Sequence, residues 1–368
     1  MNILRINEHV SKQGGGAEIY CNMLNDLLEK EGHIINNFSI KSDYKKNKPI
    51  LFIKSIFSLK YYNIIKNLIN KYDPDIIHVH NFYNTLTPSI FISAKKMNIP
   101  IVLSLHGYTQ WNKTNIFFKF PIGFLNWIKY IIRKNIVKKH VDIFECPSES
   151  IANFFSKEFD IKRKNIIVNP RPIDWNDKKI KKKNRRNKNI LYVGRLTKNK
   201  GVDTLIKSIK NIRIDDFNIK LQIVGEGPEK NNLIKLSKNL NIEDKIFFNG
   251  YIKHSLLIDN YSNADLVVLP SIIPESNGLI LIEAMSQSTP VITTNHGGQS
   301  ELVKEGFNGF LFKPGDVKGL SYKICKILND EKLSKKMGNN ARKFVEENFK
   351  PIDHLERIFK IYCSLIRN

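Results

Sequence analysis

The stretch ADLVVLPSIIPESNGLILIEAMSQSTPVITTNHGG, residues 264–298, decides the fold that we predict for this chain. It contains an apolar run at 266–269, a longer helical pattern at 279–287 and a second apolar run at 291–293. Short apolar runs are typical of buried strands, and a helix between two of them is typical of a parallel crossover. The sequence therefore predicts a parallel sheet covered by helices in this region.

The same alternation runs through most of the chain. In the first half we expect strands at 3–6, 76–80, 101–105 and 141–146, with helices at 17–31 and 61–72. In the second half we expect further strands at 190–193, 221–224 and 246–248, with helices at 202–212 and 229–240. The 368 residues are enough for two domains. The predicted fold class is α/β, with two doubly wound, Rossmann-like domains facing across a cleft.

A highly charged segment separates the two halves. Residues 174–189 read DWNDKKIKKKNRRNKN and hold almost no apolar side chains, so we interpret them as a solvated linker rather than a basic binding patch. We therefore predict an amino-terminal domain at 1–173 and a carboxyl-terminal domain at 190–351. An amphipathic pattern at 352–366 predicts a final helix.

The composition excludes several classes of protein. A hydrophobic content of 42% excludes global disorder, and a net charge of +24 favours anionic partners. The four cysteines lie far apart in the sequence, which excludes a disulfide scaffold and favours reduced thiols in a cytosol. The start, MNILRI, predicts a strand rather than a signal peptide, and the most apolar stretch, 116–132, is interrupted by Lys and Pro. We expect a cytoplasmic protein.

Two loops carry groups that suit a phosphate. Gly14, Gly15 and Gly16 precede the helix expected from residue 17, and glycines beside a helix N-terminus suit an anion, although a plain tight turn fits equally. Arg195 and Lys200 lie in VGRLTKNKG at a strand–helix junction. A guanidinium fork and an ammonium there suit a diphosphate, although a lone lysine carries little weight in so Lys-rich a chain.

Two carboxylates, Glu275 and Glu283, flank the start of the helix expected at 279–287. The first lies in the preceding loop and the second about a turn and a half into the helix. Both can accept hydrogen bonds from sugar and ribose hydroxyls, and the backbone N–H groups of Gly278, Leu279 and Ile280 are free to bind phosphate. The alternative is that both carboxylates are ordinary surface charges.

Histidines lie in or directly after two of the expected strands. His106 follows the apolar run IVLSL and precedes Gly107, which indicates that its imidazole points into the expected cleft. The alternative is a structural histidine whose hydrogen bonds are all made within the protein. His78 and His80 lie on one face of a strand, but the sequence offers no third ligand, so we predict no metal site. Asp73-Pro74-Asp75 has the form of a metal-binding DxD, yet a turn before a strand is the better interpretation.

These motifs together resemble glycosyltransferase family 4, the group 1 glycosyl transferases, which are retaining enzymes of the GT-B fold. The matching pieces are GGAE at 15–18, DIIHVHN at 75–81, LSLHG at 103–107, LYVGRLTKNKG at 191–201, LQIVGEGPE at 221–229 and the whole of 264–298. Two places depart from the family pattern. Residue 277 is Asn where Phe is frequent, and NPRPID at 169–174 replaces an N-G-V-D-like stretch.

The resemblance implies a role for each candidate residue. Arg195 and Lys200 would grip the donor diphosphate, Glu283 the ribose hydroxyls and Glu275 the donor sugar. Gly278, Leu279 and Ile280 would offer N–H groups to phosphate, Gly15 and Gly16 would approach it from the amino-terminal domain, and His106 would lie beside the transferred sugar. The final helix, 352–368, would cross back onto the amino-terminal domain.

We therefore predict a retaining, metal-independent hexosyltransferase with His106, Arg195, Lys200 and Glu275 as its catalytic residues. Its donor would be a nucleotide-diphosphate sugar, with a UDP-sugar expected, and its acceptor a glycan or lipid-linked hydroxyl, in cell-surface polysaccharide biosynthesis. We expect no cofactor and no nucleic-acid partner. The alternatives are a catalytically idle nucleotide-sugar-binding protein and a basic nucleic-acid-binding protein.

A peripheral membrane contact is a further expectation. The segment 117–140 mixes aromatic residues with Lys119, Lys129, Arg133, Lys134, Lys138 and Lys139, and from Leu125 its apolar residues recur at helical spacing. An apolar face beside a basic face suits binding to an anionic membrane surface, where lipid-linked acceptors are found. The alternative is an ordinary helix packed on the sheet.

Overall fold

The computed structural model describes residues 1–9, 16–41, 57–80, 82, 86–108, 122–173, 187–212 and 218–366. The chain divides into two compact units. Unit 1 comprises Met1–Arg171 and Pro351–Asn368, and unit 2 comprises Pro172–Lys350. Gly14, Gly15 and residues 174–186 of the expected linker lie outside the described residues.

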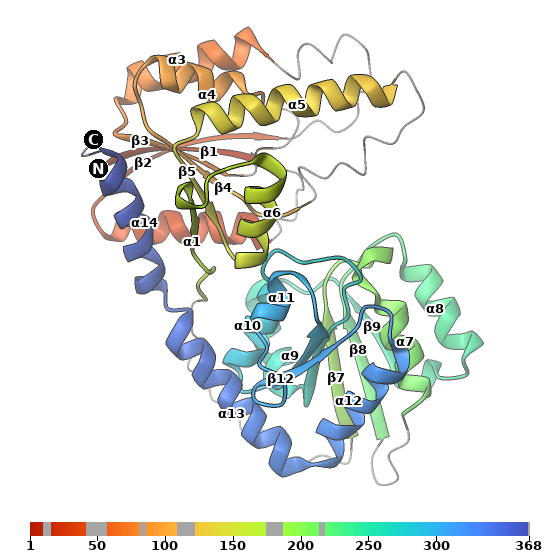
Figure 1. The fold of residues 1–368 in the computed structure, drawn as a ribbon. Coiled ribbons are helices and arrows are strands. Elements are labelled where there is room, and N and C mark those ends of the chain that lie inside the picture. Colours follow the sequence, from red (N-terminus) through yellow and green to blue (C-terminus); the bar gives the residue numbers. More distant parts are fainter. Residues whose placement is uncertain are drawn as a thin grey trace. The chain divides into compact units, whose positions relative to one another are not determined.

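Unit 1 is built on a parallel sheet of six strands in the order β2-β1-β3-β4-β5-β6 (Figure 1). The strands are β1 (Asn2–His9), β2 (Ile34–Lys41), β3 (Ile76–His80), β4 (Ile101–Ser104), β5 (Ile143–Cys146) and β6 (Ile166–Val168). The helices are α1 (Gly16–Lys30), α3 (Leu59–Tyr72), α4 (Ser89–Lys96), α5 (Ile122–His140), α6 (Glu149–Phe159) and α14 (Pro351–Ile366).

Alternate residues of these strands bury into two cores, one on each face of the sheet. In β1, Leu4 and Ile6 join the larger core with residues of α3, α4 and α6, whereas Ile3 joins a smaller core. That smaller core contains Leu24 of α1 and Ile358 of α14. A strand that buries both faces reads as a continuous apolar run, which is why β3 and β4 were predictable.

Unit 2 repeats the arrangement with the strand order β12-β11-β10-β7-β8-β9. The strands are β7 (Asn187–Val193), β8 (Asn218–Val224), β9 (Ile246–Gly250), β10 (Leu266–Leu269), β11 (Val291–Thr294) and β12 (Gly309–Phe312), and all their pairings are parallel. The helices are α7 (Val202–Lys210), α8 (Lys230–Asn239), α9 (Leu257–Asn263), α10 (Leu279–Ser286), α11 (Gly297–Glu301), α12 (Val317–Asn329) and α13 (Glu331–Asn348). The α/β fold class and the parallel sheets predicted from sequence are confirmed.

Three strands were missed, and each is short or exposed. The edge strand β2 consists of exposed and half-buried residues. It contains the polar residues Asn36, Asn37 and Ser39 among only a few apolar ones. The strands β6 and β12 have only three and four residues. Residues 187–189, placed in the linker from their charge, belong to β7 because Asn187 pairs with Asn218 in register with the rest of the strand.

The helix α5 differs from the membrane-binding helix expected at 117–140. Arg133, counted on its basic face, is buried and lies over the ring of Phe82, 4.6 Å from its centroid. Lys134 donates to the carbonyl of Glu158, and Lys138 pairs with Asp160 at 2.5 Å. Three of the five described Lys and Arg residues of this helix therefore make contacts within unit 1 itself. No helix in the described parts of the chain is long and apolar enough to cross a membrane.

Candidate active site

The loop after β7 and the loop after β10 lie against each other at the carboxyl edge of the unit 2 sheet. The first contains a short 3-10 turn, η4 (Lys198–Lys200), and Gly201, which has a φ of +65°. A Cβ at Gly201 would lie 2.1 Å from the carbonyl oxygen of Pro270. Ile272 N–H donates to the Asn199 carbonyl at 2.8 Å and ties the second loop to the first.

Because the two loops lie so close, Lys200 contacts Glu275. The resemblance implied separate roles for them, with Lys200 on the diphosphate and Glu275 on the sugar. Lys200 Nζ lies 2.6 Å from Glu275 Oε1, and the hydroxyl of Ser271 donates to the same oxygen. The two charged side chains retain 26% and 19% of their exposure, so both can still meet a ligand. A partly exposed cation and carboxylate held together form a ready pair of donor and acceptor groups.

Arg195 lies in the same loop with an exposed side chain. Its backbone carbonyl accepts the hydroxyl hydrogen of the buried Tyr192 at 3.0 Å, which fixes the loop from below. In the part of the chain that the structure describes, its guanidinium has no carboxylate partner. Arg195 is thus a cation available to an anionic ligand.

A chain of hydrogen bonds fixes the backbone around Glu275. Glu275 N–H donates to Gln299 Oε1 at 2.8 Å, and Gln299 Nε2 donates to Thr294 Oγ1 at 3.1 Å. The hydroxyl of Thr294 in turn donates to the Ser271 carbonyl at 2.9 Å. The loop from Ser271 to Glu275 is therefore braced by β11 and α11 before any ligand binds.

The helix α10 begins directly after this loop. Gly278 precedes it in the left-handed conformation, with φ +79° and ψ +49°, which a residue with a side chain adopts only under strain. Leu281 N–H bonds the Gly278 carbonyl at 2.8 Å, while the N–H groups of Gly278, Leu279 and Ile280 have no acceptor among the described residues. Such free N–H groups and the positive end of the helix dipole suit a phosphate.

Glu283, one turn further along α10, is held by two residues that the sequence did not bring to attention. His254 Nε2 donates to Glu283 Oε1 at 2.9 Å, and the hydroxyl of Tyr261 donates to Oε2 at 2.5 Å. The hydrogen bond with Glu283 raises the pKa of His254, while burial first and then Glu283 raise the pKa of Tyr261. No motif or spacing in the sequence marks either residue. His254 lies in the turn that follows β9 and Tyr261 lies in α9, so both meet Glu283 only through the fold.

Asn277, one of the two departures from the family pattern, is 4% exposed. Its Nδ2 is buried with no hydrogen-bond partner among the described residues. An unpaired buried amide is costly and rare. It lies between Glu275 and the start of α10 in the sequence.

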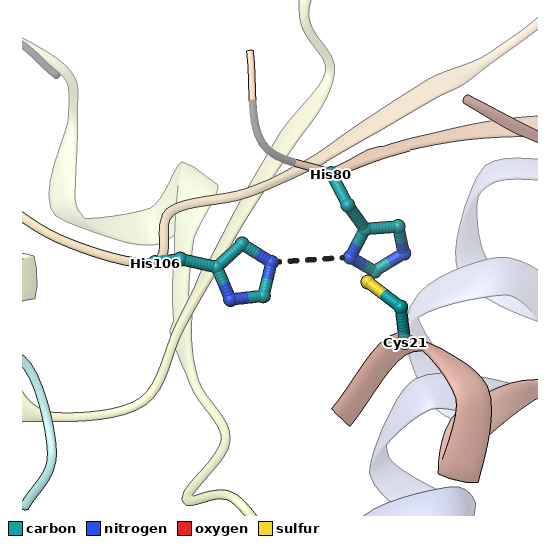
Figure 2. A group of neighbouring side chains, drawn as sticks. All are labelled: Cys21, His80 and His106. Carbon is teal, nitrogen blue, oxygen red and sulfur yellow. Dashed lines mark hydrogen bonds between the residues drawn. The ribbon is translucent and has the colours of Figure 1, made fainter. Parts of the chain in front are cut away.

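In unit 1 the structure brings His106 beside His80 and Cys21 (Figure 2). His80 ends β3, His106 follows β4, and Cys21 lies in α1. His80 Nδ1 and His106 Nε2 are 3.2 Å apart, and the three candidate ligand atoms lie within 4.8 Å of one another. No further ligand for His80 was apparent from the sequence, whereas the fold places Cys21 and His106 beside it.

The surroundings nevertheless oppose a metal. Arg5 Nη2 lies 2.6 Å from His80 Nε2, and a guanidinium has only donors to offer. A metal-binding histidine donates its other ring N–H to an acceptor, which Arg5 is not. Burial also raises the pKa of the Cys21 thiol to about 11, which disfavours the thiolate that a metal requires. The residues do not fit a resident metal ion.

The DxD-like sequence has a structural role. Asp73 ends α3 in the left-handed conformation, and its N–H donates to the Ile69 carbonyl. Asp75 Oδ2 accepts from the Asn2 N–H at 2.7 Å, at the amino end of β1. Both residues lie at the edge of the sheet opposite to His80 and His106, so the expected turn fits this geometry.

Comparison with known proteins decides the family. Residues 173–344 match the family model described as glycosyl transferases group 1, and residues 5–176 match glycosyltransferase family 4. The chain is a group 1 glycosyltransferase. The two matches together run from the first strand of unit 1 to α13 of unit 2.

Relatives of this glycosyltransferase act in several pathways. It is 27% identical to N-acetyl-alpha-D-glucosaminyl L-malate synthase of Bacillus anthracis, over 96% of this chain and 95% of that protein. It is 35% identical to the capsular polysaccharide biosynthesis glycosyltransferase CapM of Staphylococcus aureus, over 48% of this chain and 46% of CapM. Transferase activity is thus a property of the family, and some relatives serve capsule synthesis.

Solved structures agree with the GT-B fold. HepE of Anabaena, in complex with UDP, has a TM-score of 0.77 at 20% identity and covers 99% of this chain and 100% of its own. A glycosyltransferase from Rickettsia africae ESF-5 has a TM-score of 0.76 at 21% identity and covers 100% of this chain and 99% of its own. At such identities the likeness concerns the fold alone.

Replacing Gly201 with Ala tests the close packing of the two loops in this glycosyltransferase. The new Cβ would meet the Pro270 carbonyl and would also strain a positive φ, so we expect a loss of more than about 2 kcal/mol in the free energy of unfolding. Gly315 is the matched control, since its φ is +77° with nothing within 4 Å. Gly315→Ala therefore measures the backbone strain alone. Equal losses in urea denaturation of the two variants would contradict the packing argument.

Proposed function

We propose that this glycosyltransferase transfers a sugar from a nucleotide-diphosphate sugar to an acceptor hydroxyl with retention of anomeric configuration. The observation that carries the proposal is the contact of Lys200 with Glu275, which lies just before the free N–H groups at the start of α10, while Arg195 is exposed in the same loop as Lys200. This set offers cations and backbone donors to a diphosphate and a carboxylate to sugar hydroxyls.

Each residue has a distinct proposed role. Arg195, Lys200 and the N–H groups of Gly278, Leu279 and Ile280 bind the diphosphate, and Gly15 and Gly16 are further proposed phosphate contacts. Glu283 accepts from the ribose hydroxyls, in a position already fixed by His254 and Tyr261. Glu275 accepts from the sugar, and His106 contacts the transferred sugar. Asn277 Nδ2 donates to the donor molecule.

The reaction needs charge stabilisation more than proton removal. As the bond between the anomeric carbon and the diphosphate oxygen breaks, negative charge grows on the diphosphate, and preorganised cations stabilise it. The leaving oxygen takes the proton of the acceptor hydroxyl on the same face, so no general base is assigned. Glu275 is a weaker candidate for a covalent nucleophile, because its Oε1 is engaged by Lys200 and Ser271.

The donor and acceptor are also proposals. Several structural neighbours were solved with UDP or UDP-glucose, which supports a UDP-sugar as donor. The likeness to CapM supports a glycan or lipid-linked acceptor in cell-surface polysaccharide biosynthesis. A catalytically idle nucleotide-sugar-binding protein would release no nucleoside diphosphate when an acceptor is supplied, and a nucleic-acid-binding protein would bind no nucleotide sugar.

We expect Arg195→Ala and Lys200→Ala each to lower kcat about a hundredfold. Each variant loses a charge-assisted contact that strengthens in the transition state, equivalent to about 3 kcal/mol. The measurement is the release of nucleoside diphosphate in the presence of acceptor. Lys207→Ala is the control, since Lys207 is exposed on α7 and pairs with Asp203. Near-wild-type rates in both site variants would refute the assignment.

We also propose that the transfer is independent of metal, and therefore expect turnover to survive EDTA. The basic residues can balance the diphosphate charge, and Asp75 is already bonded to the backbone of β1. Turnover is compared before and after chelation, with the nucleotide sugar held constant. Complete loss in EDTA with recovery on adding manganese or magnesium would show that a metal ion is required.

Peripheral contact with an anionic membrane is proposed only through the outer face of α5. Trp127 is 47% exposed there and Lys139 is also exposed, while burial, and then Arg133, lower the pKa of Lys129 to about 8. We expect Trp127→Ala to weaken flotation with anionic vesicles about tenfold, the effect of losing about 1.5 kcal/mol of apolar burial. Tyr322→Ala, at a 67% exposed aromatic residue in unit 2, is the control. Equal flotation with neutral vesicles would remove the membrane role.

A further inference from the structure

Arg5 is a buried cation without the usual partner. Its side chain is 2% exposed, and no carboxylate pairs with it in the described chain. Its guanidinium instead donates to the Cys21 carbonyl at 3.0 Å, to Asn25 Oδ1, and to His80 Nε2 at 2.6 Å. Buried charges are normally paired, so a guanidinium placed on a neutral histidine calls for an explanation.

The donors and acceptors around His80 have a single consistent assignment. Arginine can only donate, so His80 Nε2 accepts and carries no hydrogen. The hydrogen of the neutral ring is then on Nδ1, which faces His106 Nε2 at 3.2 Å (Figure 2). His80 therefore donates to His106, and His106 Nε2 accepts.

The same reasoning fixes His106. With Nε2 accepting, the neutral ring of His106 carries its hydrogen on Nδ1. That Nδ1 has no partner among the described residues, and His106 is half-buried rather than fully enclosed. Burial is the first cause that holds the pKa of both His80 and His106 well below the usual value, and nearby Arg5 and Arg171 act in the same direction.

We propose that Arg5, acting through His80, fixes His106 as the Nδ1–H tautomer and so presents this N–H as a hydrogen-bond donor to the transferred sugar. Arg5 and His80 are positioning residues in this proposal, and the last contact rests on the proposed function. An imidazole with the opposite tautomer would present a lone pair instead of a donor at Nδ1, and its Nε2 hydrogen would face the hydrogen on His80 Nδ1. The proposal explains why a cation is buried against a histidine.

A neighbouring histidine provides an internal contrast. Ser104 has one hydroxyl hydrogen and donates it to Glu145 Oε2 at 2.6 Å, so it accepts from His78 Nε2 at 2.8 Å. His78 Nδ1 then accepts from the hydroxyl of Tyr362 at 2.6 Å. His78 is thus expected as the Nε2–H tautomer, although it is as deeply buried as His80 and lies two residues away on β3.

The test is the ¹⁵N spectrum of the histidine side chains in the full-length wild-type protein, with resonances assigned by single substitutions. Protonated and unprotonated ring nitrogens differ widely in chemical shift, so each tautomer is read directly. We expect Nδ1–H for His80 and His106 and Nε2–H for His78. A hydrogen on Nε2 of His106 would overturn the proposal without any variant having to fold.

Variants connect the tautomer to turnover. His80→Gln keeps an acceptor for Arg5 and a donor for His106, whereas His80→Leu removes both. We expect His80→Leu to shift His106 towards Nε2–H and to lower kcat/KM about tenfold, the worth of one hydrogen bond. His80→Gln should restore most of that loss. Tyr362→Phe, which alters only the His78 chain, is the control and should leave both readouts in place.

The outcomes distinguish failure of the Arg5–His80–His106 relay from failure of the proposed function. A shifted tautomer with unchanged turnover would overturn the role of the relay, while the donor-binding assignment in unit 2 would stand. Absence of transfer with every nucleotide sugar in the wild type would refute the proposed function and leave the tautomers measurable. Tight binding of one Cd²⁺ per chain, with thiolate absorbance lost in Cys21→Ser, would show that the cluster is a metal site and overturn the relay.

Discussion

The parallel direction of the strands is the constraint on which both sites depend. Every described strand pair in the two sheets is parallel, so each sheet brings all of its strand ends to one edge. In unit 2 that edge gathers Arg195 after β7 and Glu275 after β10, and in unit 1 it gathers His80 and His106. Chemistry is thus assembled from loops distant in sequence, each anchored by a buried strand.

The carboxyl edge of the unit 1 sheet buries several polar side chains. The number of hydrogen bonds that each side chain can donate or accept decides how they pair. Arg171 pairs with Glu145, which also accepts from Ser104, and the guanidinium lies 3.8 Å from the centroid of Tyr20. Each buried polar group here has few possible hydrogen-bond partners. The position of one donor hydrogen therefore determines which neighbouring atom must accept and which must donate. Two histidines on one strand can therefore hold opposite tautomers.

The sequence allowed prediction of whatever depends on burial or on local backbone chemistry. Strands β3, β4, β10 and β11 bury both faces, and Gly278 marks the start of α10. The half-exposed β2 and the brief β6 carry no such pattern. The candidate residues were identified singly, but the Lys200–Glu275 contact and the attachment of His254 to Glu283 depend on which loops meet. Arg5 reads as an ordinary strand residue until its partners are known.

The contact between Lys200 and Glu275 also bears on which ligand the proposed site selects. Before ligand binding each balances the other, and Ser271 shares the same carboxylate oxygen. A bare phosphate that drew Lys200 away would leave Glu275 with less compensation in a partly buried place. A nucleotide sugar brings hydroxyl donors along with its phosphates, so in the proposed binding mode Glu275 exchanges one donor for another. In the proposed binding mode, the ion pair therefore favours the whole donor molecule over its phosphate portion.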